Sequence, residues 1–213
     1  MFAASTYEEI ELIERQVKNR EIVVFLFVKP TNQEALNIIN EFEYIHYNSE
    51  KYCSVYAVGY SNDFEKKNDM SYRKVDATFG SNWYFSMEAF TDFKNRLEER
   101  INWNYSGEVE ILILQNNPGS CNSLDFRNYV AIDVNKGIRE GYMDSFQGFM
   151  ESLVRSAKFS ATAKEAIDDM AINRISIKKI ITDTIDDCKR IPLPIKSIVK
   201  DRLFYRCANS IFD

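Results

Sequence analysis

The sequence has little of what most catalytic and metal-binding sites use. Among its 213 residues there is one histidine, His46, and the cysteines are so far apart that no CxxC pair exists. A single histidine argues against metal sites built from several histidines, and neither a zinc knuckle nor a dithiol redox pair is visible. We therefore expect no cofactor, no metal and four reduced cysteines, most of them buried as small hydrophobic residues. They are Cys53, Cys121, Cys188 and Cys207.

Long hydrophobic runs are also missing. The longest purely apolar stretch lies within Ile22–Val28, far below the roughly 20 residues that cross a bilayer. The first residues become acidic within eight positions, unlike a secretory signal peptide. These features predict a soluble, cytoplasmic protein without a membrane partner.

Charge divides the chain into two sections. Hydrophobic residues make up 45% and charged residues 28%, which is a globular composition. The net charge of −5 is uneven, because residues 1–155 carry 16 Lys and Arg against 24 Asp and Glu, a net −8. Residues 156–213 carry 11 against 8, a net +3. We predict one domain over residues 1–155 and an extension over residues 156–213.

Hydrophobic patterns predict a strand–helix–strand unit near the N-terminus. Capping boxes at Ser5 and Thr6 predict a first helix that runs to about Asn19. The continuous apolar run Ile22–Val28 is typical of a central parallel strand, covered on both faces. A capping box at Thr31 begins the next helix, and a second internal strand is expected over Tyr52–Tyr60.

The second half of the domain is predicted to form a helix, a β-hairpin and a further helix. A short edge strand is expected near Tyr72–Thr78, and Ser86 can cap a helix. Val109–Leu114 and Asn128–Val134 are predicted to form an antiparallel hairpin around a turn signal. A further helix is capped at Asp144 or Ser145. From residue 156 on, three apolar stripes at helical spacing predict an all-helical extension.

This order of elements resembles the thioredoxin fold, in which a βαβ half and a ββα half flank a central helix. The resemblance covers roughly residues 5–155 and implies an α/β fold with a mixed sheet flanked by helices. Thioredoxins carry a CxxC where the first long strand meets its helix, and this chain has Val28-Lys29-Pro30-Thr31-Asn32 there. They also place a cis-proline before the hairpin, where this chain has Ser106-Gly107-Glu108. The resemblance therefore implies the fold without the redox chemistry.

Acidic residues near the two hairpin strands suggest a divalent-metal site. Glu110, Asp133 and Lys136 resemble the carboxylates and lysine of PD-(D/E)xK nucleases, which hold Mg²⁺ and orient a water. The spacing differs, since Asp133 and Lys136 are one residue too far apart for (D/E)xK. Polar residues at strand ends are the simpler reading. His46 with Cys53 is a second, weaker candidate pair, because no third orienting group is identifiable.

Two further segments are candidate contact surfaces. The hairpin loop predicts a partner-contacting tip, with Asn117, Ser120, Phe126 and Arg127. Six basic residues against one acid lie between Lys189 and Arg206, and a basic helix there can contact nucleic-acid phosphates. The outer face of a packed helix is the alternative reading. The candidate phosphate contacts are Lys189, Arg190, Lys196, Lys200 and Arg206.

The sequence as a whole favours a non-catalytic role. Aromatic residues reach 14%, and tyrosine and tryptophan are enriched at protein interfaces. We expect a microbial binding or adaptor protein that acts through protein–protein contacts, in a complex or as a homo-oligomer. A metal-dependent nuclease or nucleotide-processing enzyme and a nucleic-acid-binding module are the alternatives.

Overall fold

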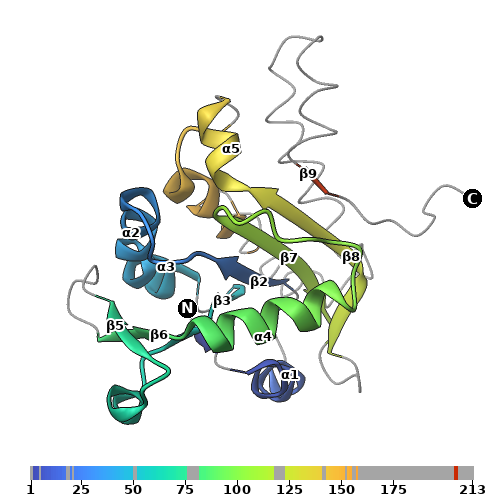
Figure 1. Cartoon of the computed structure of the whole chain (residues 1–213). Coiled ribbons are helices and arrows are strands. Elements are labelled where there is room, and N and C mark those ends of the chain that lie inside the picture. The colour runs from blue at the N-terminus through green and yellow to red at the C-terminus, as the bar shows by residue number, and fades with distance from the viewer. Residues whose placement is uncertain are drawn as a thin grey trace, which may run out of the picture.

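A mixed sheet flanked by helices forms the centre of the computed structural model (Figure 1). The structure describes residues 2–4, 6–17, 20, 22–49, 52–75, 82–117, 123–140, 143–151, 153, 154, 157, 204 and 205. The large sheet has the order β1-β3-β2-β7-β8-β9, and a small sheet has the order β4-β6-β5. The strands of the large sheet are β1 (Phe2–Ala4), β2 (Ile22–Phe27), β3 (Ser54–Val58), β7 (Glu110–Asn116), β8 (Leu124–Asp133) and β9 (Phe204–Tyr205). Those of the small sheet are β4 (Tyr60–Ser61), β5 (Arg73–Val75) and β6 (Trp83–Phe85).

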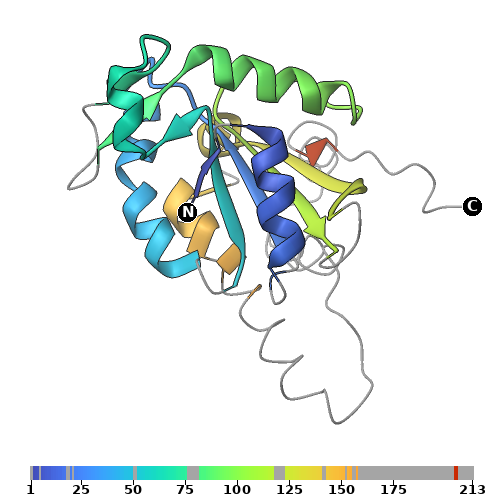
Figure 2. The same ribbon diagram turned by 90° about the horizontal axis from the view of Figure 1, so that it is seen from below.

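Helices connect and cover these strands. Residues 146–151 are also helical. The other helices of the described residues are α1 (Tyr7–Gln16), α2 (Gln33–Asn40), α3 (Phe42–Ser49), α4 (Met87–Glu98), α5 (Val134–Arg139) and the 3₁₀ helix η1 (Phe64–Asn68). Figure 2 shows α4 on one side of the large sheet and α2 with α3 on the opposite side. Within the described residues, no helix has the length and apolar character needed to cross a membrane.

Strand β2 occupies the centre of the large sheet, as its continuous apolar sequence predicts. All six of its residues are buried, because helices cover both faces. Its neighbour β3 runs parallel to it, whereas β7 on its other side runs antiparallel. The prediction of an internal strand is confirmed, and the parallel pairing holds on one side only.

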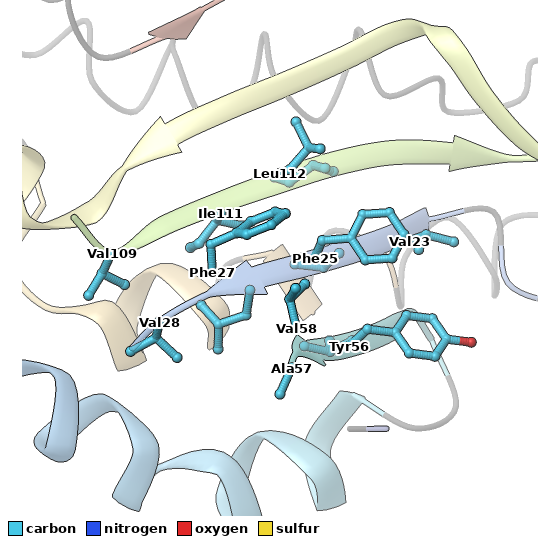
Figure 3. Close-up of a cluster of buried hydrophobic side chains, with 14 of the residues drawn as sticks. Val23, Phe25, Phe27, Val28, Tyr56, Ala57, Val58, Val109, Ile111 and Leu112 are labelled. Carbon is cyan, nitrogen blue, oxygen red and sulfur yellow. The ribbon is translucent and has the colours of Figure 1, made fainter. Parts of the chain in front are cut away.

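Aromatic rings from β2 and α4 form much of the core on one face. Phe25 lies 5.2 Å from Phe93 between ring centroids, and Phe27 lies 5.8 Å from Phe90. Trp103 completes this cluster at 4.8 Å from Phe27. Figure 3 shows Phe25 and Phe27 of β2 beside buried side chains of β3 and β7 such as Tyr56 and Ile111. Burying such large rings supplies a major part of the free energy of folding.

Three of four predicted helix N-caps are found at the residues where the sequence predicts them. Thr6 Oγ1 accepts a hydrogen bond from Glu9 N, Ser86 Oγ from Ala89 N and Ser145 Oγ from Gly148 N, as N-caps do. The fourth prediction, Thr31, is wrong by one residue.

The helix predicted after Thr31 begins later and is divided. Asn32 Oδ1 accepts from Ala35 N at 2.8 Å and is the N-cap of α2. The apolar stripe that predicted one long helix continues across a break at Glu41, so α2 and α3 are separate helices.

The strand predicted over Tyr52–Tyr60 also divides. Gly59 has a φ of +78°, and a Cβ there would lie 2.7 Å from Phe90 Cβ. Glycine permits this conformation and this close approach. The chain turns at Gly59, leaves the large sheet and enters the small one as β4, so Tyr52 and Tyr60 lie outside β3.

The hairpin of β7 and β8 is confirmed, while several short elements, among them the 3₁₀ helix η1, were not expected from the sequence. The pairing runs antiparallel from Glu110 opposite Asp133, with a register shift between Leu114 and Gln115. Strands β1 and β6 and helix α5 were not predicted. The short strand expected near Tyr72–Thr78 is present as β5 over the residues described there.

The predicted C-terminal helices lie almost entirely outside the described residues, as does the division at residue 156. One part of that prediction is wrong. Phe204 and Tyr205 were expected within a helix, but they form β9 and pair antiparallel with Ile132 and Ala131 of β8. Extended pairing at the sheet edge replaces helical structure at these two residues.

Candidate ligand-binding cleft

A cleft lies beside the junction where β2 ends and α2 begins, and we call it the junction cleft. Its volume is about 810 Å³, within the range of about 300–1,000 Å³ that is usual for ligand sites. Segments far apart in the sequence meet there. Its lining residues are Pro30, Thr31, Gln33, Leu36, Asn40, Met70, Ser71, Arg73, Lys74, Val75, Phe85, Met87 and Glu88.

Local structure fixes each wall of the junction cleft. On one side, the turn through Pro30 and Thr31 leads into α2. Opposite, β5 pairs with β6, and the N-cap Ser86 places Met87 in the first turn of α4. Gly59 lets β3 continue into the small sheet that carries this wall. The cleft is therefore built by the insertion of β4, β5 and β6 between β3 and α4.

The lining combines exposed methionines with cations. Met70 is fully exposed and Met87 is 48% exposed. Methionine side chains adapt their shape to varied apolar partners. Arg73 and Lys74 are exposed, and neither forms an ion pair within the part of the chain that the structure describes. Glu88 is the one acid in the lining, so the surface offers apolar contacts and positive charge.

Among the described residues, no cysteine lines the junction cleft. Cys53 is completely buried, and burial raises the pKa of its thiol to about 12. A thiol with so high a pKa supplies almost no thiolate at neutral pH. His46 lies in the last turn of α3, with its ring 5.5 Å from that of Tyr47. The proposed pair of Cys53 and His46 therefore lacks an accessible nucleophile.

The predicted acidic residues do come together in the hairpin. Glu110 and Asp133 lie opposite each other on β7 and β8. The buried Glu110 carboxylate accepts hydrogen bonds from Trp103 Nε1 at 2.8 Å and from Ser106 N at 2.7 Å. Burial raises the pKa of Glu110, and the nearby charge of Asp133 raises it further.

Asp133 and Lys136 meet through the backbone of α5. Asp133 Oδ1 accepts from Lys136 N at 2.8 Å and is the N-cap of this helix. Both acids thus have structural roles, which explain them without a metal. Within the described residues, no group of three or more His, Cys, Asp or Glu side chains is arranged to hold a metal ion.

The predicted partner-contacting tip is described only in part. Asn117 N donates to Ser123 O at 2.6 Å and closes the ends of the loop. Phe126 is half-buried, with its ring 6.2 Å from Tyr7 and 5.6 Å from the Arg100 guanidinium. Phe126 therefore packs within the fold instead of projecting from the tip. Ser120 and the Arg127 side chain lie outside the described residues.

The candidate nucleic-acid contacts also lie outside the described residues. They are Lys189, Arg190, Lys196, Lys200 and Arg206. The neighbouring Phe204 and Tyr205 are in β9, so a single helix does not run from residue 189 to residue 206.

No local pattern in the sequence predicts the junction cleft, because the segments that form its walls are remote from one another in sequence. One signal was present: Met70 lies in a polar, irregular stretch, and Met87 directly follows a helix cap. Apolar residues in such places have no core role to fill. No known protein-family model matches the chain, and neither the curated proteins nor the solved structures contain a detectable relative.

Proposed function

We propose that this chain is a thioredoxin-like protein without redox chemistry, which binds a cytoplasmic protein partner and catalyses no reaction. The observation that carries the proposal is the junction cleft, which offers methionines and two cations and, within the part of the chain that the structure describes, has neither ionic partners for these cations nor a cysteine in its lining. An adaptor needs a surface of this kind.

The order of the strands supports the thioredoxin-like part of the proposal. In the order β1-β3-β2-β7-β8, the first three strands are parallel to one another. Strand β7 runs antiparallel to β2, and β8 runs antiparallel to β7. Helix α4 separates a βαβ half from a ββα half, as the resemblance implies. The junction where redox members carry their cysteines is Lys29-Pro30-Thr31-Asn32 here, and it borders the cleft.

A capture experiment with paired variants tests the function. The full chain is tagged, expressed in its source organism and purified, and its assemblies are weighed by native mass spectrometry. We expect a defined complex, which the double variant Met70→Glu, Met87→Glu abolishes. Both side chains are exposed, so the variant keeps its fold.

The matched control carries the same charges elsewhere. Leu12 and Tyr47 are 57% and 74% exposed, and neither lines the junction cleft. The double variant Leu12→Glu, Tyr47→Glu should retain the complex. A strict monomer without a partner, or a complex that survives the methionine variant, contradicts the proposal.

A further inference from the structure

Strand β5 is the outer strand of the small sheet and lines the junction cleft along its whole length. It pairs with β6 from Arg73 to Val75, and no other described strand pairs with it. Within the described residues, the backbone of β5 forms hydrogen bonds with β6 alone. An unpaired strand edge offers N–H and C=O groups to an extended chain that aligns beside it.

The charge on this strand has one sign. Arg73 and Lys74 have no ionic partner among the described residues, although the whole chain carries a net charge of −5. Some cations elsewhere are paired: the guanidinium of Arg96 contacts Glu8 and Asp92. Charge complementarity therefore favours a ligand with carboxylates opposite β5.

The apolar part of the lining fits an extended segment as well. Leu36 from α2 is partly buried against the core, while Val75 and Phe85 are buried beside it. Met70 and Met87 are exposed within the same lining. Side chains of an extended chain point alternately to opposite sides. Arg73 and Lys74 are consecutive residues, so their side chains lie on opposite faces of β5, and a carboxylate on either side of the segment can reach one of the two cations. Apolar side chains of the segment can contact the apolar lining.

We infer that the partner segment bound in the junction cleft is an extended, acidic stretch of protein that adds as a strand to the edge of β5. This inference rests on the proposed function and specifies its ligand. Backbone hydrogen bonds to β5 hold the segment, Arg73 and Lys74 select carboxylates, and the methionines accommodate its apolar residues. Nucleic acid is less favoured, because the net negative charge of the chain opposes its approach.

Selection from a random peptide library tests the chemistry of the ligand. The full chain is immobilised and screened against random twelve-residue peptides displayed on phage. We expect the selected peptides to be enriched in Asp and Glu relative to the input library. The double variant Arg73→Glu, Lys74→Glu should lose affinity for a selected acidic peptide by about tenfold or more. Arg139→Glu, on the exposed end of α5, is the control and should leave affinity unchanged.

Hydrogen exchange tests the binding mode. Addition of a strand to β5 should slow exchange of at least one backbone amide within Arg73–Val75 when the selected peptide is present. Binding through charge alone leaves these exchange rates unchanged and overturns the strand-addition mode.

The outcomes separate this inference from the proposed function. Selected peptides without acidic enrichment, or binding of a 20-base-pair DNA in their place, overturn the inference. Concentration-dependent dimerisation that Arg73→Glu, Lys74→Glu abolishes also overturns it and assigns the cleft to a second copy. If the native complex still depends on Met70 and Met87 in any of these cases, the proposed function stands and its ligand is different.

Discussion

A buried glutamate lies at each end of β7, Glu110 as its first residue and Glu14 of α1 beside its last residue, Asn116, and the two carboxylates differ in what surrounds them. At the end of β7, Glu14 Oε1 accepts from Tyr56 Oη at 2.6 Å, and Glu14 Oε2 accepts from Asn116 Nδ2 at 2.7 Å. At its beginning, Glu110 accepts from Trp103 Nε1 and Ser106 N. We call the first the closed end of the sheet. The second is the open end, because Phe27, which pairs with Glu110, is the last residue of β2, and the chain leads from there to Pro30 and Thr31 in the junction cleft.

The two ends differ in whether the polar side chains have partners within the described residues. At the closed end, Asn116 Nδ2 also donates to Arg20 O at 3.2 Å, and Arg20 donates to Ser54 Oγ at 3.4 Å. At the open end the Glu110 carboxylate is satisfied too, but Arg73 and Lys74 in the junction cleft have no ionic partner among the described residues. The closed end therefore serves stability, and the open end leaves groups available for binding.

The largest effect is expected at the closed end. Glu14→Ala removes the acceptor of two buried donors, Tyr56 Oη and Asn116 Nδ2, and leaves a void. Each unsatisfied buried group costs about 1–3 kcal/mol, so we expect a loss of roughly 4 kcal/mol in the free energy of unfolding. Urea denaturation followed by circular dichroism measures it.

Glu14→Gln is the control for this prediction. The Oε1 atom of the introduced glutamine can still accept from Asn116 Nδ2, and its Nε2 can donate to Tyr56 Oη, because a tyrosine hydroxyl also accepts. We expect a loss of only about 1 kcal/mol. Equal losses for the two variants would show that the network is not what stabilises this end.

A smaller effect is expected at the open end. Glu110→Ala leaves Trp103 Nε1 and Ser106 N without their acceptor. Ser106 is only partly enclosed, so water can replace one of the two bonds there. We expect a loss of about 2 kcal/mol, measured by the same denaturation. A loss greater than that of Glu14→Ala would reverse the comparison between the ends.

Both glutamates should make stability depend on pH in the same direction. Burial is the main cause that raises the pKa of each carboxyl in the folded chain. A raised folded-state pKa stabilises the fold fully below the unfolded-state pKa, about 4.3 for glutamate, and this contribution is lost as pH rises through the folded-state pKa. Exposed acids such as Glu8, whose pKa is lowered by hydrogen bonds, act in the opposite sense at lower pH.

The comparison that isolates the two groups is with the double variant Glu14→Gln, Glu110→Gln. As pH rises from 4 upward, the wild type should lose stability relative to this variant. Thermal denaturation across that range measures the difference. A stability difference that stays constant with pH would mean that neither carboxyl has a raised pKa.

The sequence predicted the elements whose signals are local. Ser86 and Ser145 cap helices where their patterns say, and the run Ile22–Val28 forms the central strand. The breaks at Gly59, which separates β3 from β4, and at Glu41, which separates α2 from α3, could not be predicted from a local pattern. Gly59 turns the chain because of its close approach to Phe90, a contact between remote segments.

The candidate site shows the same limit. An aspartate such as Asp133 can bind a metal or cap a helix, and its residue type does not distinguish the two roles. The hydrogen bond from Lys136 N to Asp133 Oδ1 identifies it as a helix cap. The junction cleft joins Pro30, Met70 and Met87, which no local pattern connects. Short strands such as β1 and β6 depend on their partner strands for pairing, so their three residues carry little signal alone.

The smallest effect tests whether every cation at the open end is free for binding. Lys29 Nζ lies 4.9 Å from the ring centroid of Tyr105 and 5.4 Å from that of Phe90. Lys29→Met keeps the aliphatic chain and removes this cation–π contact, which should cost about 0.5–1 kcal/mol in unfolding free energy. Lys74→Met, whose side chain has no such ring beneath it among the described residues, should cost nothing measurable.

The effects of the same two variants on ligand affinity should be the opposite of their effects on stability. Lys29 does not line the junction cleft, so its replacement should leave the affinity for a selected acidic peptide unchanged. Replacement of Lys74 should weaken that affinity, because its charge faces the cleft without an ionic partner in the described residues. If both variants lose stability and neither loses affinity, the cations of the open end stabilise the fold and do not select a ligand.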